Sequence, residues 1–333
     1  MSEKPRTAFT SGTAALFLAS FALFASATED PAKYPSQPIK LIVPFAPAGA
    51  SDFAARLIQN SMAQFLGRPI IIENRAGAAG NIGMTEAARA APDGYTVFLG
   101  NVGTLSVNPS LFPDLKLKPD KDFFAISLVA ETPDILVVSK TFPPNSVKEL
   151  IEHVRARPGK VNYASPGSGS LNRLEMEVFR KNAGLDMQHV PYKGGAAPAV
   201  TDVLAGHVEL MFTTISSCIE QVKSGDLKAL AVTTKERIPA LPDVPTMLES
   251  GYPNSVSSSW QGVLVPKNTP RPIVTKLYEA VVHALADAEV RQRMTEGGVL
   301  PVVSKSPEEF AEYIAAETAR WAKIAKETGA RLD

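Results

Sequence analysis

The stretch IKLIVPFAPAGASDFAARLIQNSMAQFLG, residues 39–67, decides the class of the fold. Its first part, IKLIVPF, is apolar and β-branched, which indicates a buried strand. The second part is helical: Ser51 is a candidate N-cap, Asp52 lies in the first turn, and Gly67 is a candidate C-cap. The turn between the two parts consists almost entirely of Pro, Ala, Gly and Ser. A strand, a short turn and a helix form the repeating unit of α/β folds.

The same alternation of strands and helices continues along the chain. Short runs rich in β-branched and aromatic residues predict strands, and helical stretches lie between them. Two of these helices begin with a capping-box pattern, Ser146 with Glu149 and Ser306 with Glu309. We therefore expect an α/β fold. The further strands that we expect are residues 69–75, 95–101, 135–139, 161–165, 208–214, 227–233 and 258–266.

Two proline-rich stretches, residues 139–146 and 235–246, suggest how the domains are arranged. If the chain leaves one domain near the first stretch and returns near the second, the middle third forms a separate domain joined by two crossings. Such an arrangement allows hinge closure over a cleft. We expect domain 1 to comprise residues 28–136 plus 236–333, and domain 2 to comprise residues 137–235.

The N-terminus predicts export. Lys4 and Arg6 precede an apolar run, residues 14–25, and the small residues Ala-Ser-Ala follow at its end. This pattern is typical of a secretory signal peptide, here residues 1–27. The alternative is an uncleaved membrane anchor, but the apolar run is too short to span a bilayer comfortably.

Composition and motifs argue against several classes of protein. The chain has 34 basic and 34 acidic residues, so charge gives no reason to expect nucleic acid or an anionic membrane as partner. Cys218 is the only cysteine, and a lone buried cysteine more often packs than reacts. The four histidines lack metal-ligand spacing, and no dinucleotide, P-loop or nucleophile-elbow motif occurs. We therefore expect no catalytic residues, no metal and no cofactor.

Four turns at the carboxyl ends of predicted strands carry small or hydroxyl residues. They are the turn before Asp52 and the segments 76–83, 165–173 and 213–217. Free N–H groups and the positive end of a helix dipole attract anions, and small residues let a ligand reach the backbone. A single turn of this kind is more often plain turn chemistry. Four of them at the strand ends, where α/β sheets bind ligands, favour a small carboxylate as ligand.

The chain resembles the periplasmic substrate-binding proteins of tripartite tricarboxylate transporters, often called the Bug family. The resemblance covers nearly the whole mature chain. The segments that carry it are IKLIVPFAPAGASDFAARL (39–57), GRPIIIENRAGAAGNIG (67–83), ARAAPDGYTVFLGN (88–101), NPSLF (108–112), GLDMQHVPYKGGAAPAVTDVLAGHVELMF (184–212), VKSGDLKALAVTT (222–234) and IPALPDVPTMLESGYP (238–253).

The resemblance implies an α/β, two-domain periplasmic-binding-protein fold of the type II-like kind, with two interdomain crossings and a ligand cleft between the domains. It implies a periplasmic receptor without enzymatic activity. The ligand would be a small carboxylate, such as a di- or tricarboxylate or an aromatic carboxylate, and a membrane permease of a tripartite transporter would receive it.

The resemblance also implies which residues hold the ligand. They lie on a loop and a neighbouring turn of the first domain and on the wall of the second. The residues expected at the site are Phe45, Ala48, Gly49, Ala50, Ser51, Asp52, Asn101, Thr104, Ser165, Ser168, Gly169, Ser170, Arg173, Tyr192, Lys193, Thr213 and Thr214.

Three departures from the family pattern affect the expected ligand. Ala48 stands where the family usually has Gly, so the backbone there is expected to avoid positive φ. Arg173 stands where His is expected, and Thr213-Thr214 stand where Asp-Asn is common. Because these two changes remove an anion and add a cation, we expect a ligand with more negative charge or a second carboxylate that pairs with Arg173. The alternative is that Arg173 projects into solvent.

Two further residues have alternative roles. A carboxylate at Asp52 would repel an anionic ligand, so we expect it to cap the helix start or to orient a neighbouring donor. Phe45 either covers the apolar part of the ligand or belongs to the core.

The leading hypothesis is a receptor without enzymatic activity. One alternative is a ligand-sensing protein that docks onto a signalling partner. An exported hydrolase is a weaker alternative, because no nucleophile and base are visible. The effector domain of a regulator is weaker still, since the sequence shows an export signal and no helix-turn-helix segment.

Overall fold

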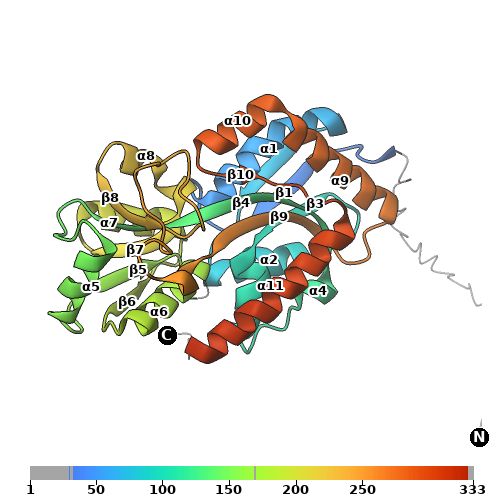
Figure 1. Cartoon of the computed structure of the whole chain (residues 1–333). Coiled ribbons are helices and arrows are strands. Elements are labelled where there is room, and N and C mark those ends of the chain that lie inside the picture. Colours follow the sequence, from blue (N-terminus) through green and yellow to red (C-terminus); the bar gives the residue numbers. More distant parts are fainter. Residues whose placement is uncertain (1–29, 31–32, 169, 329–333) are drawn as a thin grey trace, which may run out of the picture.

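The computed structural model of the chain describes residues 30, 33–168 and 170–328. Within these residues a ten-stranded mixed sheet runs through two lobes, and helices cover both faces of each lobe (Figure 1). The central strand order is β2-β1-β3-β9-β4-β7-β5-β6, and both β8 and β10 pair with β4. The expected α/β fold with two lobes is confirmed. The expected signal peptide lies outside the described residues.

The first lobe contains the amino-terminal strands and the carboxyl-terminal third of the chain. Strands β1, β2 and β3 are parallel, whereas β9 runs antiparallel between β3 and β4. The main elements of this lobe are β1 (Ile39–Val43), α1 (Ala50–Leu66), β2 (Ile70–Asn74), α2 (Asn81–Ala88), β3 (Thr96–Asn101), α3 (Asn108–Leu111), α4 (Pro119–Asp122), β9 (Ser258–Pro266), α9 (Arg271–Ala286), α10 (Ala288–Glu296), β10 (Leu300–Pro301) and α11 (Pro307–Thr328).

The second lobe is formed by the middle of the chain. Strands β5, β6 and β7 are parallel, and β7 and β8 both run antiparallel to β4. The main elements are α5 (Val147–Arg155), β5 (Asn162–Ser165), α6 (Leu171–Ala183), β6 (Gln188–Pro191), α7 (Ala196–Ala205), β7 (Leu210–Thr214), α8 (Ile219–Lys223) and β8 (Leu227–Val232).

Strand β4 (Phe123–Ser139) is the first crossing between the lobes. Its residues 123–133 pair with β9, and its residues 134–139 pair with β7 and β8. The sequence predicted only residues 135–139 as a strand. The earlier part was missed because Pro133 and two register shifts interrupt its alternation of apolar and polar residues.

The second crossing returns from β8 to β9 through residues 233–257. The Thr233 N–H donates to the Asp134 carbonyl at 2.8 Å, and the Ser257 N–H donates to the Thr233 carbonyl at 3.1 Å. Within this segment, Leu241 and Met247 pack into the hydrophobic cores of the second lobe. We therefore propose that the second lobe extends to about Ser257, beyond the expected limit of 235.

The ends of the helices follow local chemistry. Ser146 Oγ accepts the Glu149 N–H at 3.2 Å, and Ser306 Oγ accepts the Glu309 N–H at 3.2 Å, so both predicted capping residues are confirmed. Gly67 ends α1 with φ of 69°, as predicted. The prediction that Ser51 is the N-cap of α1 is wrong. The helix begins at Ala50, with Gly49 as N-cap.

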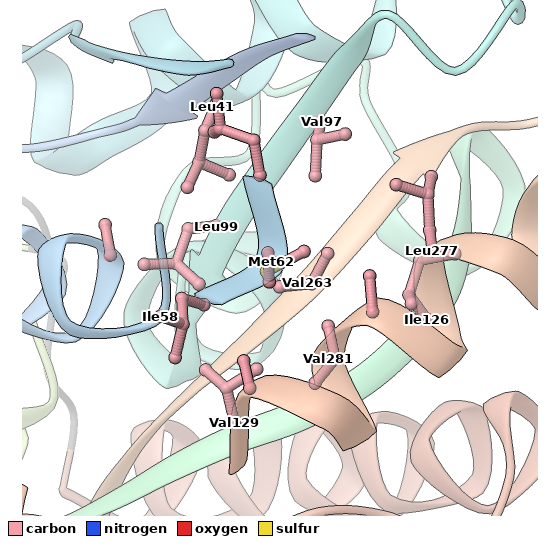
Figure 2. Packing of buried hydrophobic residues seen from close by; sticks show 14 of the residues in the cluster. Leu41, Ile58, Met62, Val97, Leu99, Ile126, Val129, Val263, Leu277 and Val281 are labelled. Atoms are coloured by element: carbon pink, nitrogen blue, oxygen red, sulfur yellow. The ribbon is translucent and has the colours of Figure 1, made fainter. Parts of the chain in front are cut away.

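The hydrophobic cores lie on both faces of the sheet in both lobes. In the first lobe, Ile58 and Met62 of α1 meet Leu277 and Val281 of α9 over the strands (Figure 2). On the opposite face α11 covers Trp260, whose ring meets Phe310 edge-on with centroids 5.8 Å apart. These layers hold the strand ends in place, so the loops between the lobes rest on rigid supports.

Candidate functional site

A cleft lies between the lobes at the carboxyl ends of β1, β3, β5 and β7. It encloses about 550 Å³ of space, part of it open to solvent. Both lobes and the strand β9 contribute to its walls. The residues that line it are Phe45, Gly49, Ala50, Ser51, Ala79, Asn101, Val102, Gly103, Pro166, Ser170, Leu171, Asn172, Ala196, Thr214, Ser259 and Gln261.

Part of the predicted site lines this cleft. The predicted residues among the lining are Phe45, Gly49, Ala50, Ser51, Asn101, Ser170 and Thr214. Ala48, Asp52, Thr104, Ser165, Ser168, Arg173, Tyr192, Lys193 and Thr213 do not line it. Gly169 lies outside the described residues.

Sequence reasoning missed two kinds of lining residue. Asn172 and Ala79 belong to turns that were singled out, so the small-residue pattern of those turns was a usable signal. Ser259 and Gln261 lie within β9, where no local motif marks them. They reach the cleft only because β9 pairs with β3, opposite Asn101.

Three helices begin at the cleft: α1 from the first lobe, and α6 and α7 from the second. The N-caps of α1 and α7 are Gly49 and Gly195, and neither helix has a side-chain cap. Backbone N–H groups in the first turn of a helix have no intrahelical acceptor and attract anions. The helix starts therefore direct partial positive charge into the cleft from both sides.

No charged side chain occurs among the described residues that line the cleft. An anion bound there would be held by backbone N–H groups, hydroxyls and amides. Preorganised neutral donors of this kind can replace the hydration of a carboxylate.

Asp52 organises the turn that leads into α1. Its carboxylate accepts hydrogen bonds from the Ala48 N–H at 3.0 Å, Arg56 Nε at 2.8 Å and Asn74 Nδ2 at 3.0 Å. Burial opposes the ionisation of Asp52, but these hydrogen bonds outweigh it and the pKa lies below its usual value. Asp52 therefore holds the loop beside the cleft.

The expectation for the backbone of Ala48 is wrong. Ala48 has φ of 67°, in the left-handed region that favours glycine. The hydrogen bond from its N–H to Asp52 holds the turn in this conformation. The turn therefore keeps a shape suited to glycine although the residue is alanine.

Arg173 lies in neither of the two expected positions. Its side chain is buried, with 5% of the residue exposed, so it does not project into solvent. Its Nη1 donates to the Ser168 carbonyl at 3.0 Å, and the residue does not line the cleft. Arg173 therefore braces the loop between β5 and α6.

Other predicted site residues also shape loops. Ser165 Oγ lies 2.7 Å from His189 Nε2 and donates to the Gly167 carbonyl at 3.1 Å. Thr104 Oγ1 bonds to Asn101 Oδ1 at 3.0 Å. The Tyr192 hydroxyl donates to Asp202 Oδ2 at 2.6 Å, and burial raises the pKa of Tyr192 to about 12. Each of these bonds fixes a loop next to the cleft.

Two buried carboxyl groups lie behind the cleft, where the lobes join. Asn172 Nδ2 donates to Asp134 Oδ1 at 2.8 Å and to Glu175 Oε2 at 3.1 Å, and Ser257 Oγ donates to Glu175 Oε1. Burial raises the pKa of both carboxyl groups, and for Asp134 the charge of Glu175 raises it further. The two carboxyl groups therefore retain their protons to higher pH than ordinary carboxyl groups do.

The lobes also touch across the mouth of the cleft. The Ala46 N–H of the first lobe donates to the Gly194 carbonyl of the second at 3.3 Å. A Cβ at Gly195 would lie 3.3 Å from Phe45 Cδ1. Phe45 thus lines the cleft and meets the opposite lobe, and is not part of a core cluster.

The described residues offer little to catalysis or metal binding. Cys218 is buried, and burial raises the pKa of its thiol far above its usual value, so the reactive thiolate is disfavoured. Within the described ranges, no group of three or more His, Cys, Asp and Glu side chains is arranged to hold a metal ion. No helix in the same part of the chain is both long and apolar enough to cross a membrane.

Two lobes joined by two crossings, with helix starts converging on the cleft between them, define a periplasmic-binding-protein fold. The chain belongs to the tripartite tricarboxylate transporter receptor family, because the family profile, described as "Tripartite tricarboxylate transporter family receptor", matches residues 54–330. The members of this family are periplasmic substrate-binding receptors, not enzymes. The resemblance seen in the sequence is confirmed.

Individual relatives agree with this assignment. Protein BugT of Bordetella pertussis is 37% identical over 318 residues, which cover 95% of this chain and 96% of the relative. The structure of MatC from Rhodopseudomonas palustris with bound malate is 36% identical, with a TM-score of 0.83 and coverage of 87% of this chain and 99% of that one. The structure of Rpa4515 from R. palustris with adipate is 34% identical, with a TM-score of 0.87 and coverage of 90% and 100%.

Proposed function

We propose that this protein is an exported receptor that binds a small dicarboxylate in the cleft and delivers it to the permease of a tripartite transporter. The observation that carries the proposal is the convergence of α1 and α6 from opposite lobes on one uncharged cleft. One carboxylate would lie against the start of each helix. The malate and adipate named for two related structures are dicarboxylates, which supports the same ligand class.

The structure favours a dicarboxylate over a ligand of higher charge. The sequence hypothesis relied on Arg173 to pair with an additional carboxylate, but Arg173 is buried against the Ser168 carbonyl. Without a cation in the lining, each additional negative charge would lose its hydration without compensation. A dicarboxylate has one carboxylate for the helix start of each lobe.

The ligand class is tested by thermal shift and calorimetry on residues 28–333. The panel contains mono-, di- and tricarboxylates, aromatic carboxylates and their methyl esters. A ligand present at about 100 times its Kd stabilises the folded state by about 2.7 kcal/mol, which raises the melting temperature by several degrees. Stabilisation by dicarboxylates but not by their diesters is expected. A panel in which no carboxylate binds would contradict the proposal.

Export and delivery are tested separately. Mass spectrometry of the protein from the periplasm should show a mature chain that begins at Thr28. Deletion of the gene should abolish uptake of the dicarboxylate that binds best. Normal uptake in the deletion strain would contradict delivery to a permease and favour a sensing role instead.

A further inference from the structure

Gln261 carries a buried hydrogen-bond donor at the cleft. The residue is 1% exposed, and its Oε1 accepts a hydrogen bond from Thr132 Oγ1 at 3.2 Å. Its Nε2 is buried and has no hydrogen-bond partner among the described residues. A buried amide donor without an acceptor destabilises a protein, so such groups need a specific explanation.

The pairing of β9 explains why this side chain faces the cleft. Side chains alternate between the two faces of a strand. Ser259 and Gln261 share the face that contributes to the cleft, whereas Trp260 between them packs under α11 with Phe310. Gln261 also lies opposite Asn101, another lining residue, in the ladder with β3.

Asn172 contributes an acceptor to the same cleft. Its Nδ2 donates to the two buried carboxyl groups of Asp134 and Glu175. Both hydrogens of the amide are therefore engaged behind the cleft wall, and the remaining polar atom of the side chain is Oδ1. Of these two buried amides, Gln261 is the one whose donor remains for a ligand.

We propose that Gln261 is a ligand-binding residue whose Nε2 donates a hydrogen bond to a carboxylate oxygen of the bound dicarboxylate. The inference rests on the proposed function and adds a donor from strand β9 to those of the helix starts. Thr132 fixes the amide by holding Oε1, so the donor is preorganised. The unpaired donor costs stability in the ligand-free protein and is satisfied when the ligand binds.

This role predicts a much larger effect on binding than on stability. In Gln261→Met the side chain keeps a similar length, loses the unpaired donor and leaves the Thr132 hydroxyl without its acceptor. Because these two changes offset each other, the melting temperature of the ligand-free protein should change little, while the Kd for malate or adipate should increase about tenfold or more. In Gln261→Glu a carboxylate replaces the amide, and repulsion should remove measurable binding at neutral pH.

Ser61→Ala is the matched control. Ser61 Oγ is also buried without a hydrogen-bond partner in the described chain, but it lies in α1 outside the cleft lining. Its replacement should leave the Kd unchanged. The measurements are melting curves of the ligand-free proteins and isothermal calorimetry with malate and adipate.

The outcomes separate this inference from the proposed function. If the wild-type protein binds a dicarboxylate and Gln261→Met binds it equally well, Gln261 is not a ligand contact and the proposed function stands. A fall in stability without a change in Kd would assign Gln261 a purely structural role and would also overturn the inference. If the wild-type protein binds neither malate nor adipate nor any other dicarboxylate, the proposed function fails and this inference fails with it.

Discussion

Ala48 and the buried carboxyl pair show how single residues set the properties of the cleft. Ala48 holds a left-handed backbone conformation that costs an L-residue about 1–2 kcal/mol. Asp134 and Glu175 lie together out of solvent, joined by the Asn172 amide. Both features lower the stability of the folded protein, and both lie next to the loops that form the site. Destabilising features of this kind are common near functional sites.

Replacing Ala48 with Gly should relieve the backbone strain. The gain of about 1 kcal/mol is partly offset by the greater entropy of the unfolded chain, so we expect Ala48→Gly to be neutral or stabilising by up to about 1 kcal/mol. Ala311→Gly on the exposed face of α11 is the control and should cost about 1 kcal/mol. Urea unfolding curves of the three proteins provide the comparison. Equal losses in both variants would show that residue 48 is unstrained.

The carboxyl pair should make stability depend on pH. Because burial raises the pKa of Asp134 and Glu175 in the folded state, the folded protein binds more protons than the unfolded chain above about pH 4. The contribution of these extra protons to the free energy of unfolding is fully present at low pH and is lost as the pH rises through the raised pKa values. The free energy of unfolding falls by at most about 1.4 kcal/mol per pH unit for each retained proton.

Asp134→Asn tests this dependence. The amide cannot ionise but can donate to the Glu175 carboxylate, so the stability of the variant relative to wild type should increase between pH 5 and pH 9. Melting temperatures across this range measure it, with the exposed Asp120→Asn as control. Parallel curves for Asp134→Asn and wild type would show that the pair holds no proton in this range.

At the scale of elements, the loops from the two lobes meet over the cleft. The loop after β1 carries Phe45 and Ala46, and the loop before α7 carries Gly194 and Gly195. Their contact includes one hydrogen bond and a close approach of Phe45 to the backbone of Gly195. Opening of the lobes would break these contacts, so they stabilise the conformation that would enclose a ligand.

Gly195→Ala should weaken ligand binding. A Cβ there would press on Phe45 at 3.3 Å, and φ of 95° strains any L-residue. A cost of about 1 kcal/mol to the closed state raises the Kd about fivefold. Gly225→Ala is the matched control, because Gly225 has φ of 75° but no atom near the added Cβ. Calorimetry should show weaker binding only for Gly195→Ala, and equal Kd values would exclude an effect on closure.

The whole molecule is two lobes joined where strand β4 and the segment before β9 cross between them. Asp134 of β4, Thr233 after β8 and Ser257 before β9 bond to one another at this junction. Two core clusters lie on either side of it, but Leu171 and Leu174 of α6 pack in the first-lobe cluster that contains Trp260, so motion between the lobes must change that contact. Such an architecture would allow the binding of a small ligand to change the overall shape.

Ligand binding should protect the contact across the cleft from hydrogen exchange. The Ala46 N–H donates to the Gly194 carbonyl across the two lobes, so opening of the lobes would break this bond. A ligand at about 100 times its Kd should reduce the open population about 100-fold and slow exchange of this amide accordingly. Exchange of buried β1 amides is the internal reference for general stabilisation. Protection that is no greater at Ala46 than in β1 would contradict closure upon binding.

Much of the fold was predictable because its signals are local. The strand-helix alternation and the caps at Ser146 and Ser306 depend on neighbouring residues, and the structure shows them as expected. The first half of β4 was missed because Pro133 and the register shifts hide a strand that long-range pairing stabilises. The left-handed Ala48 was missed because the hydrogen bond from its N–H to Asp52, a carboxylate that Asn74 also holds, overrode its intrinsic preference.

The α/β class, the two-lobed family fold and the loops that border the cleft follow from patterns among neighbouring residues or from motifs, so they could be predicted from the sequence. Which side chains reach the cleft depends on the tertiary structure. Gln261 lines it because β9 pairs with β3, a strand more than a hundred residues earlier in the chain. Arg173 does not line the cleft, and its Nη1 donates to the Ser168 carbonyl. The carboxyl pair forms because helix α6 packs against the crossing of β4. These outcomes depend on strand register and on packing between distant segments, which local sequence patterns do not encode.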